Sequence, residues 1–409
     1  MKLTSIAMRN IMRNLRRSLL SGIAIAVSTM SIVLLFAFVQ GMIDDMAMNI
    51  KSYSTGEIRI RNEAYSEYER YSPLHLTVDW PEILPILEQT PGVSAFVPRI
   101  QFAASAYMNG SNHGLMVMGS DFNYEDGFID VREILREGRL CEPGKNETIM
   151  GAGLANRLHL TIGDKVTLLT NTATRGSNAF TLTIVGIAVF PVGAMNASYT
   201  MIPLDRAQYF LHMDSEVQEI LVMADDSVKE NTLASLIDQS ILDHTGVQTE
   251  VKTWKQLNDL MTLMDIASYA YYVIAFFFFI LGSTVIINTT MMVIFERMRE
   301  IGTLAAMGMH GKELTRLFFL EGAIIGAIGA AIGVIVGVVI TSYFGIIGLD
   351  FTDALSGIDM EMSSVLYPRT DYWRVLIIYV YAVATASLAT LIPSRRASKI
   401  EPVEALRYV

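Results

Sequence analysis

Residues 266–295 read IASYAYYVIAFFFFILGSTVIINTTMMVIF and contain no charged side chain. At about 1.5 Å per residue, a helix over this stretch would be about 45 Å long, which exceeds the roughly 30 Å hydrocarbon core of a bilayer. Three further uncharged runs occupy residues 18–43, 322–349 and 375–392. Because a charge at mid-bilayer costs about 2.5–3.5 kcal/mol, four such runs predict four transmembrane helices.

The basic residues near the span ends predict the orientation of the chain. Residues 1–17 carry five Lys or Arg and no acid, and the tail from 393 to 409 carries four more basic residues. Since basic residues gather on the cytoplasmic side, both termini are expected in the cytosol. An alternative, a cleaved signal peptide, would need a small-residue site after the apolar run, and Ala24-Ile25-Ala26 falls too early in it.

The block between the first two spans is large and acidic. Residues 44–265 hold 16 basic and 30 acidic side chains, against a net charge of −10 for the whole chain. This balance offers no basic surface for a nucleic acid. The expected organisation is therefore a cytosolic amphipathic helix at 1–17, spans at 18–43, 266–295, 322–349 and 375–392, an outer domain at 44–265, a cytosolic coupling segment at 296–321, a short outer loop at 350–374 and a cytosolic tail at 393–409.

The outer block alternates strand-like and helix-like runs, which predicts a mixed α/β (α+β) domain inserted between spans one and two. Strands are expected at 57–61, 93–108, 166–169, 180–187 and 219–224, and helices at 81–89, 153–157, 204–210 and 229–244. The stretch 217–253 resembles 55–100 in length and order. We therefore expect one subdomain closed by both ends of the block, with about 105–215 inserted.

Apolar spacing of 3 and 4 residues continues past the first span and begins before the second. Two helices that leave the bilayer and pair as a stalk would show this pattern. Juxtamembrane helices that pack on the outer domain would show it equally, so both interpretations stay open. The stalk residues expected on this basis are Val39, Ile43, Met46, Ile50, Trp254, Leu257, Met261 and Met264.

The third span carries a stripe of glycines that lets helix backbones approach closely. Packing against another span of the same chain is the favoured interpretation, and a subunit interface is the alternative. The glycines expected to pack are Gly322, Gly326, Gly329, Gly333 and Gly337.

A charged segment, REIGTLAAMG at residues 299–308, lies between spans two and three on the side of the basic termini. A small helix that faces the cytosol between two spans is a surface on which a cytosolic protein can bind and exert force on both spans. We expect this helix to couple the spans to an ATPase. Its residues are Arg299, Glu300, Ile301, Gly302, Thr303, Leu304, Ala305, Ala306, Met307 and Gly308.

The sequence lacks motifs for chemistry of its own. Gly144-Lys145 and Gly311-Lys312 lack the following hydroxyl of a nucleotide-binding P-loop, the six histidines form no i, i+4 pair, and no G-x-S-x-G motif occurs. Cys141 is the single cysteine, which excludes an intrachain disulfide and favours a small packed residue. We expect no catalytic residue, metal site or cofactor in this chain.

Several phrases in a fixed order resemble the MacB, LolC/LolE and FtsX-like permeases of ABC transporters. They are the R-N-x-x-R-x-x-R-S lead-in at 9–18, IMGAGLANRLHLTIGDKV at 149–166, FTLTIVGI at 180–187, IPLDRAQ at 202–208, FERMREIGTLAAMGMHGKELTRLFFLEG at 295–322, and the tail at 393–406 ending in IEPVEAL. The resemblance implies a dimeric permease in the bacterial inner membrane, paired with a second copy or a paralogue. It also implies a separate cytosolic ABC ATPase that binds ATP and Mg²⁺, and a mechanotransmission mechanism.

Within this family, the absence of a fused ATPase favours lipoprotein release from the inner membrane or a split efflux pump, and lipoprotein release is the preferred prediction. The alternatives are a split MacB-type efflux permease for periplasmic peptide, toxin or drug cargo, and an FtsX-like signalling permease that controls cell-wall hydrolases. The hairpin that recruits a lipoprotein chaperone in one release-branch subunit would fall at 170–179. Here it is short and has no proline, so no direct chaperone recruitment is expected from it.

Overall fold

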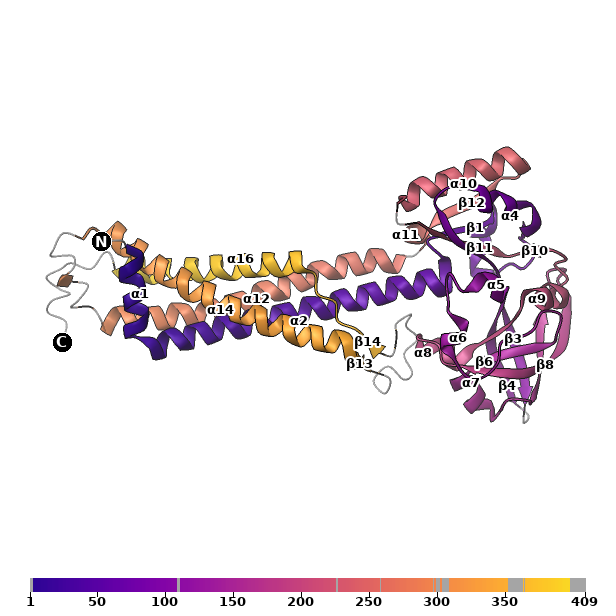
Figure 1. The fold of residues 1–409 in the computed structure, drawn as a ribbon, viewed down its shortest axis with the longest axis horizontal. Helices are drawn as coiled ribbons and strands as arrows, with labels where there is room; N and C mark the ends of the chain where they lie inside the picture. The colour runs from indigo at the N-terminus through magenta and orange to yellow at the C-terminus, as the bar shows by residue number, and fades with distance from the viewer. Residues whose placement is uncertain are drawn as a thin grey trace. The chain divides into compact units, whose positions relative to one another are not determined.

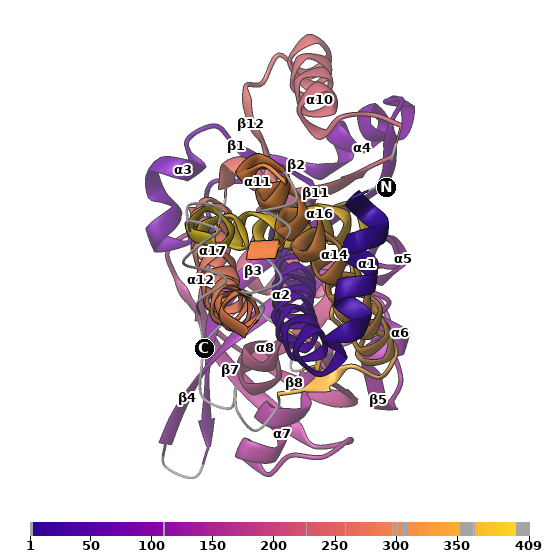
Figure 2. The same cartoon turned by 90° about the vertical axis from the view of Figure 1, so that its left-hand side faces the viewer.

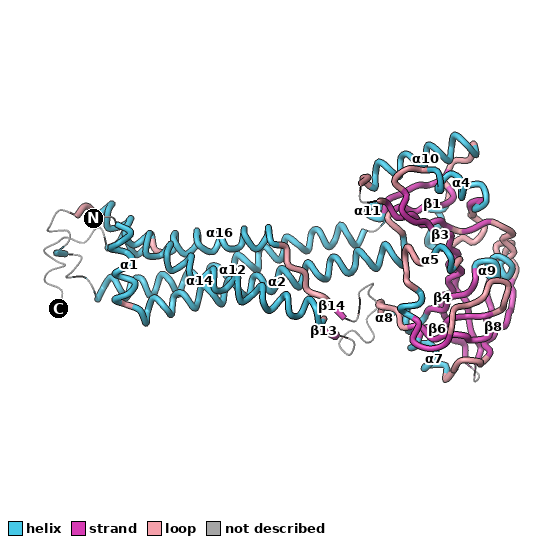
Figure 3. Tube along the Cα trace, viewed as in Figure 1, coloured by secondary structure: helices cyan, strands magenta, loops and turns pink. Residues whose placement is uncertain are grey.

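The computed structural model describes residues 3–108, 111–225, 227–257, 259–296, 298, 302–303, 309–351, 363 and 365–397. Contacts divide the chain into two units (Figure 1). We call Met1–Ile43, Met264–Leu349 and Leu366–Val409 the membrane bundle, and Asp44–Leu263 with Asp350–Val365 the α/β domain. Helices make up the described part of the bundle almost entirely, and the long strands all lie in the α/β domain (Figure 3).

The membrane bundle is built from one short crosswise helix, four long helices and a short final helix. They are α1 (Leu3–Arg13), α2 (Leu15–Asn49), α12 (Asp259–Glu296), α14 (Gly311–Ile347), α16 (Tyr372–Ala389) and α17 (Leu391–Ala397). The two short strands β13 (Leu349–Asp350) and β14 (Val365–Leu366) pair between α14 and α16. Figure 2 shows α1 lying against α14 at one end of the bundle.

Four stretches of the described chain are long and apolar enough to cross a membrane: Ser18–Thr55, Tyr269–Glu296, Gly311–Ile347 and Tyr372–Arg395. The four predicted transmembrane helices are therefore confirmed. Helix α14 nevertheless begins at Gly311, eleven residues before the expected start of the third span at 322. The first turns of α14 carry charged side chains and lie within residues 296–321, the segment expected to couple the spans to an ATPase. This segment is helical from Gly311 onward.

Contacts between the long helices close a ring of four. Helix α2 joins α12 through a hydrogen bond between Ser21 Oγ and Thr289 Oγ1 (2.6 Å). Helix α12 joins α16 through the rings of Phe279 and Tyr381, whose centroids lie 4.7 Å apart at 72°. An edge-to-face pair of this kind adds about 0.5–1.5 kcal/mol beyond the area it buries. Helix α14 completes the ring through its glycines.

All five predicted packing glycines are buried, and they face two different helices of the same chain. A methyl group at Gly326 would lie 2.6 Å from Cβ of Ala386 on α16, and one at Gly329 would lie 2.6 Å from the carbonyl oxygen of Gly22 on α2. Gly322 also faces α16, whereas Gly333 and Gly337 also face α2. Backbone-to-backbone packing within the chain thus uses the whole stripe.

The α/β domain has many short helices around a large sheet. Its helices are η1 (Ile50–Thr55, a π-helix), α3 (Tyr65–Tyr68), η2 (Glu69–Tyr71), α4 (Trp80–Gln89), α5 (Phe122–Glu125), α6 (Val131–Ile134), α7 (Ala152–Leu158), α8 (Gly193–Ser198), α9 (Leu204–Leu211), α10 (Glu230–Thr245) and α11 (Trp254–Leu257). Its strands are β1 (Ile58–Asn62), β2 (Val78–Asp79), β3 (Val93–Met108), β4 (Ser111–Ser120), β5 (Leu135–Gly138), β6 (Glu147–Gly151), β7 (Lys165–Asn171), β8 (Ser177–Ala188), β9 (Tyr199–Pro203), β10 (Glu216–Val217), β11 (Glu219–Ala224) and β12 (Thr249–Thr253).

Both ends of the domain sequence meet in the sheet. Strand β1 lies between β11 and β12, so that Ile60 pairs with Ile220 on one side and with Val251 on the other. This arrangement matches the expected closure of one subdomain by residues 55–100 and 217–253. The strands expected at 93–108 and 219–224 are β3 and β11.

The inserted residues do not form a separate sheet. The strand order is β12-β1-β11-β3-β4-β9-β6-β8-β5, and β7 pairs with both β3 and β8. Strands β3, β4, β9, β6, β8 and β7 therefore close a ring, in which each strand is paired on both sides, and β12 and β5 remain at the ends of the strand order. At about 3.3 Å per residue, the 16 residues of β3 span about 53 Å, enough to pair with β11 in its first half and with β4 in its second.

The core of the domain has two apolar clusters. The larger lies between the sheet and helices that include α4, α7, α9 and α10, and the smaller includes Phe190, Met201 and Cys141. The Cys141 side chain is buried, and this burial raises the pKa of its thiol well above the ordinary value. It is a packed residue with little thiolate character, as expected for a structural cysteine.

Arg99, on β3, is fully buried and binds the end of the helix that precedes the domain. Its guanidinium donates to the carbonyl oxygens of Ser52 (2.8 Å) and Tyr53 (3.2 Å) in η1. It also forms an ion pair with the buried carboxylate of Glu125, which accepts a further hydrogen bond from Ser120. A helix end leaves carbonyls without partners, and a cation there satisfies them and opposes the helix dipole.

We predict that Gly329→Ala destabilises the bundle by about 1–3 kcal/mol, because the added methyl group forces two backbones apart. Thermal unfolding in detergent measures the loss. Gly22→Ala is the matched control on the opposite helix, since its methyl group would meet nothing closer than Ile325 Cγ2 at 4.0 Å. Equal melting temperatures for the two variants would contradict this account of the glycine stripe.

We predict that Arg99→Met costs about 3–5 kcal/mol, because it leaves the buried Glu125 carboxylate charged and without its cation. The double variant Arg99→Met/Glu125→Leu should recover part of the loss, while the carbonyls of Ser52 and Tyr53 stay unpaired. Denaturant unfolding monitored by tryptophan fluorescence gives both values. Arg139→Met, at the half-exposed ion pair with Glu147, is the control and should cost less. No recovery in the double variant would refute the pairing argument.

Candidate functional site

The predicted coupling helix lies mostly outside the described residues. Of its ten members, the structure describes Gly302 and Thr303, which are helical. The other eight, which are Arg299, Glu300, Ile301, Leu304, Ala305, Ala306, Met307 and Gly308, lie outside the described part of the chain. The site is therefore built from the residues on either side of this segment.

An apolar cluster joins the two helices that flank the coupling segment. Ile294 and Met298 follow from α12, and Leu314 and Phe318 lie on the first turns of α14; all four side chains are buried, with Met309 packed against them. The Glu313 carboxylate accepts a hydrogen bond from the His310 backbone N–H (3.1 Å), which caps α14. The cluster and the cap therefore hold the end of α12 against the start of α14.

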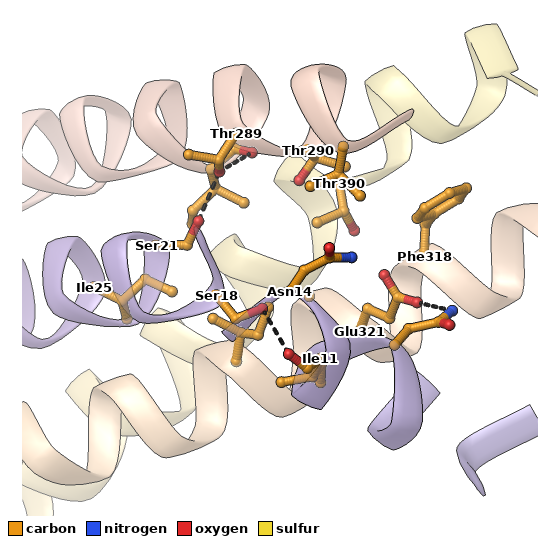
Figure 4. A pocket seen from close by; sticks show the side chains of 15 residues that line it. Ile11, Asn14, Ser18, Ser21, Ile25, Thr289, Thr290, Phe318, Glu321 and Thr390 are labelled. Carbon is orange, nitrogen blue, oxygen red and sulfur yellow. Dashed lines mark hydrogen bonds between the residues drawn. The ribbon is translucent and has the colours of Figure 1, made fainter. Parts of the chain in front are cut away.

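A polar cavity of about 50 Å³ lies next to this cluster (Figure 4). Phe318 belongs to both, and Asn14, at the turn between α1 and α2, projects into the cavity. Since one water needs about 10–15 Å³ by this measure, the space suits about three waters. Its lining comes from helices α1, α2, α12 and α14 and from Thr390 beside α16.

Hydrogen bonds across the cavity tie helices that are distant in sequence. Asn10 Nδ2 on α1 donates to Glu321 Oε1 on α14 (2.6 Å), and Ser21 on α2 bonds Thr289 on α12 (2.6 Å) (Figure 4). A hydrogen bond to a carboxylate contributes about 1.5–3 kcal/mol, more than a neutral one. The cavity therefore links the crosswise helix α1 to the helices beside the coupling segment.

The sequence analysis missed this cavity, although a signal for it exists. Asn10 and Asn14 stand four residues apart in an amphipathic helix, and amides at that spacing share one face. The contact between Asn10 and Glu321 depends on how α14 packs against α1, which the sequence does not indicate. No three-residue cluster of His, Cys, Asp or Glu able to hold a metal ion occurs among the described residues.

The predicted stalk residues lie on the two segments that connect the bundle to the α/β domain. Val39, Met46, Ile50 and Trp254 are buried, whereas Ile43 and Leu257 are partly buried. Met261 and Met264 lie in α12, and their side chains are outside the described set. Helix α2 continues directly into η1, and α12 begins thirteen residues before Tyr272, about 20 Å of helix.

The two connecting segments meet at the base of the α/β domain. Lys51 Nζ in η1 lies 4.9 Å from the centroid of the Trp254 ring on α11 and 2.6 Å from Glu57 Oε1. The indole N–H of Trp254 donates to Glu230 on α10 (3.0 Å), whose carboxylate is also 3.6 Å from Lys51. A cation over an indole ring adds about 0.5–1 kcal/mol at partly exposed sites. These contacts fasten both segments to the same domain.

A residue between α14 and α16 also binds the last turns of α2. Ser363 donates its N–H (2.9 Å) and its hydroxyl (2.7 Å) to the Asp45 carboxylate and accepts a hydrogen bond from Asn49 Nδ2 (3.1 Å). Ser363 also forms a β-bridge with Val192. These hydrogen bonds fix Ser363 to two side chains of α2.

Two family models match this chain: MacB-like periplasmic core domain over residues 18–240, and FtsX-like permease C-terminal over residues 272–402. Among curated relatives, the lipoprotein-releasing system transmembrane protein LolC of Neisseria meningitidis serogroup B is 26% identical over 344 residues, covering 81% of this chain and 82% of that protein. LolC of Xylella fastidiosa is 25% identical, with 82% of each chain covered, and LolE of Haemophilus influenzae is 23% identical, with 80% of each covered.

Solved structures resemble the chain over about half its length. The periplasmic region of MacB from Actinobacillus actinomycetemcomitans aligns with a TM-score of 0.38 at 11% identity, covering 53% of this chain and 97% of that one. The extracellular domain of the noncanonic ABC-type transporter YknZ from Gram-positive bacteria aligns with a TM-score of 0.35 at 12% identity, covering 48% and 98%. The model for the MacB-like periplasmic core domain covers more than half of the sequence, and the chain therefore belongs to the family of ABC transporter permeases that combine this domain with an FtsX-like permease C-terminal part.

Proposed function

We propose that this chain is the permease subunit of a transporter that releases lipoproteins from the bacterial inner membrane. In this proposal a separate cytosolic ABC ATPase binds ATP and Mg²⁺ and pushes on residues 299–308. A second copy or a paralogue completes a dimer. Both termini face the cytosol in this proposal, because basic residues gather at both ends of the chain: Arg9 and Arg13 on α1, Arg16 at the start of α2, and four more in residues 393–409.

The observation that carries the proposal is the course of α2. This helix supplies Ser18 and Ser21 to the polar cavity beside the coupling cluster, and it continues without interruption into η1, where Lys51 and the Arg99-bound carbonyls lie. In this proposal, one helix contributes both to the cavity near residues 299–308 and to the α/β domain. A helix that couples the two is what a mechanical transporter needs.

Lipoprotein cargo is favoured by energetics and by the relatives. Each buried methylene of an acyl chain contributes about 0.8 kcal/mol, so removing several chains from a bilayer costs tens of kcal/mol before any compensation. A free-energy cost of this size requires an energy source such as ATP hydrolysis. The relatives named LolC and LolE carry lipoprotein release in their names. Efflux of periplasmic cargo is the second candidate, because the matched domain carries the MacB name.

Reconstitution tests both the cargo and the coupling. The permease, its co-purified ATPase and an acylated lipoprotein in proteoliposomes should release the lipoprotein to the soluble phase only with ATP. Ile301→Asp/Leu304→Asp should cut lipoprotein-stimulated ATP turnover at least about tenfold, since a buried hot-spot residue contributes about 1.4 kcal/mol or more.

The control for this experiment is Lys312→Ala, an exposed residue on the first turn of α14, which should keep release near the normal level. The deacylated lipoprotein should stay without effect on ATP turnover. Release that is unchanged in the double variant would refute the coupling role. Stimulation by unacylated peptide alone would favour efflux.

A disulfide tests whether α2 and α12 move together. A Cβ at Gly282 would lie 3.7 Å from Ser28 Cβ, within the range of disulfide geometry. Ser28→Cys/Gly282→Cys should therefore cross-link readily under mild oxidation and keep lipoprotein release, because the proposal treats the two helices as one moving body. Free thiols are counted after denaturation, when only Cys141 should react.

Ser28→Cys/Thr284→Cys, with its second position on the exposed face of α12, should not cross-link. Loss of release on cross-linking would show that the helices slide past each other.

A further inference from the structure

A groove on the surface of the membrane bundle runs between α12 and α16. It encloses about 360 Å³. Its floor is formed by buried side chains that include Phe36 on α2 and Phe279 on α12. Its walls are exposed: Phe276 stands on the α12 side, and Ile377 and Tyr381 stand on the α16 side. The walls are apolar along most of their length. An acyl chain that lies in the groove would therefore contact protein side chains on both sides instead of other lipids.

Exposed aromatic side chains place one end of this groove at the level of the lipid head groups. Tyrosine and tryptophan gather where membrane meets water. The exposed residues of this kind at one end of the spans are Tyr269, Tyr272, Tyr343, Tyr367, Tyr372 and Trp373. A hydrogen bond between Thr341 and Thr370 (2.9 Å) sets the ends of α14 and α16 at a common level. The groove begins at Tyr272 and reaches Phe279, seven residues or about 10 Å deeper.

A cation stands at the head-group end of the groove. Arg374, on the first turn of α16, lines the groove beside Tyr272 and Ile377. Its Nε lies 3.3 Å from Asp371 Oδ2 in an ion pair, and the guanidinium carries five N–H donors in all. Asp371 is also the N-cap of α16 and accepts a hydrogen bond from the Trp373 backbone N–H (2.9 Å). Its charge is therefore shared between the helix end and Arg374.

We propose that this groove holds one glycerophospholipid, with its phosphate on Arg374 and one acyl chain between the α12 and α16 walls. Guanidinium binds phosphate with two parallel hydrogen bonds and is the side chain best suited to it. Along the groove, the cation comes first, then the level of the aromatic side chains, and then the apolar walls. A glycerophospholipid has its phosphate, its glycerol and its acyl chain in the same order. A helix from a second copy fits less well, because a helix is about 10 Å wide and brings no anion to Arg374.

The lipid is placed to join two spans that are far apart in sequence. Its chain would touch both α12, which leads to the α/β domain, and α16, which touches α12 within the bundle through Phe279 and Tyr381. The site depends on the bundle alone and does not require the proposed cargo or direction of transport. Failure of the lipoprotein release experiment would therefore leave it standing.

Native mass spectrometry of the full-length permease from nanodiscs of phosphatidylglycerol and phosphatidylethanolamine tests the site. The unmodified chain should retain one phospholipid per copy. Arg374→Gln should lower the retained fraction at least about fivefold, which is about 1 kcal/mol. Ala275→Leu should lower it similarly, because Ala275 lies in the buried floor and the larger side chain fills the channel.

Val380→Leu is the control, since it adds one methylene group on an exposed face of α16 away from the groove lining. It should retain the lipid as the unmodified chain does. Glycerol 3-phosphate at millimolar concentration, which has the head group without the chains, should not displace the lipid. Equal retention by the unmodified chain and Arg374→Gln would overturn the proposal. So would a dimer that contains no lipid and dissociates in the Arg374→Gln variant, because a second copy would then occupy the groove.

A thermal shift gives a second readout that does not depend on survival in the gas phase. Added phosphatidylglycerol should raise the melting temperature of the unmodified chain and of Val380→Leu, because a ligand that binds only the folded state stabilises it. Arg374→Gln should lose most of this shift while eluting as a folded protein in size-exclusion chromatography. An undiminished shift in Arg374→Gln would refute the role of the cation.

Discussion

The carbonyl groups at the end of η1 set the constraint on which the α/β domain depends. A helix that enters a folded domain must satisfy its last carbonyls away from water, and Arg99 does this from the centre of the longest strand. The same side chain needs Glu125 to balance its charge, and Glu125 in turn accepts from Ser120 on β4. One buried cation thus connects the α2–η1 segment with strands β3 and β4 and with helix α5.

Much of the fold could be predicted from the sequence because its signals are local. Charge-free runs gave the four spans, and hydrophobic alternation gave β3 and β11 to the residue. Strands such as β4 and β9 escaped because they are short or polar at one end, and they pair in parallel across 80 residues of chain. The closed ring of six strands could not be predicted either, since β7 meets β3 only once the whole insertion is folded.

The candidate site was predictable in part for the same reason. The charged segment between two spans is a feature of the sequence alone, and the apolar cluster on its flanks follows from the helix period. The polar cavity and the Ser363 contact depend on which helix faces which. Asn10 and Glu321 are 311 residues apart, and Asp45 and Ser363 are 318 apart. No spacing rule connects residues at such separations, so only the three-dimensional register brings them together.

The placement of Cys141 has a practical consequence for watching this protein at work. The chain contains one cysteine, and it lies in the smaller apolar cluster with its thiol kept protonated by burial. Reagents that attack thiolates will pass it by while the domain stays folded. A fluorophore or spin probe can therefore be attached through a single introduced thiol, with every natural residue elsewhere left unchanged. A pair of introduced thiols, one on a helix and one on the sheet, makes the distance between them measurable during turnover in an otherwise native background.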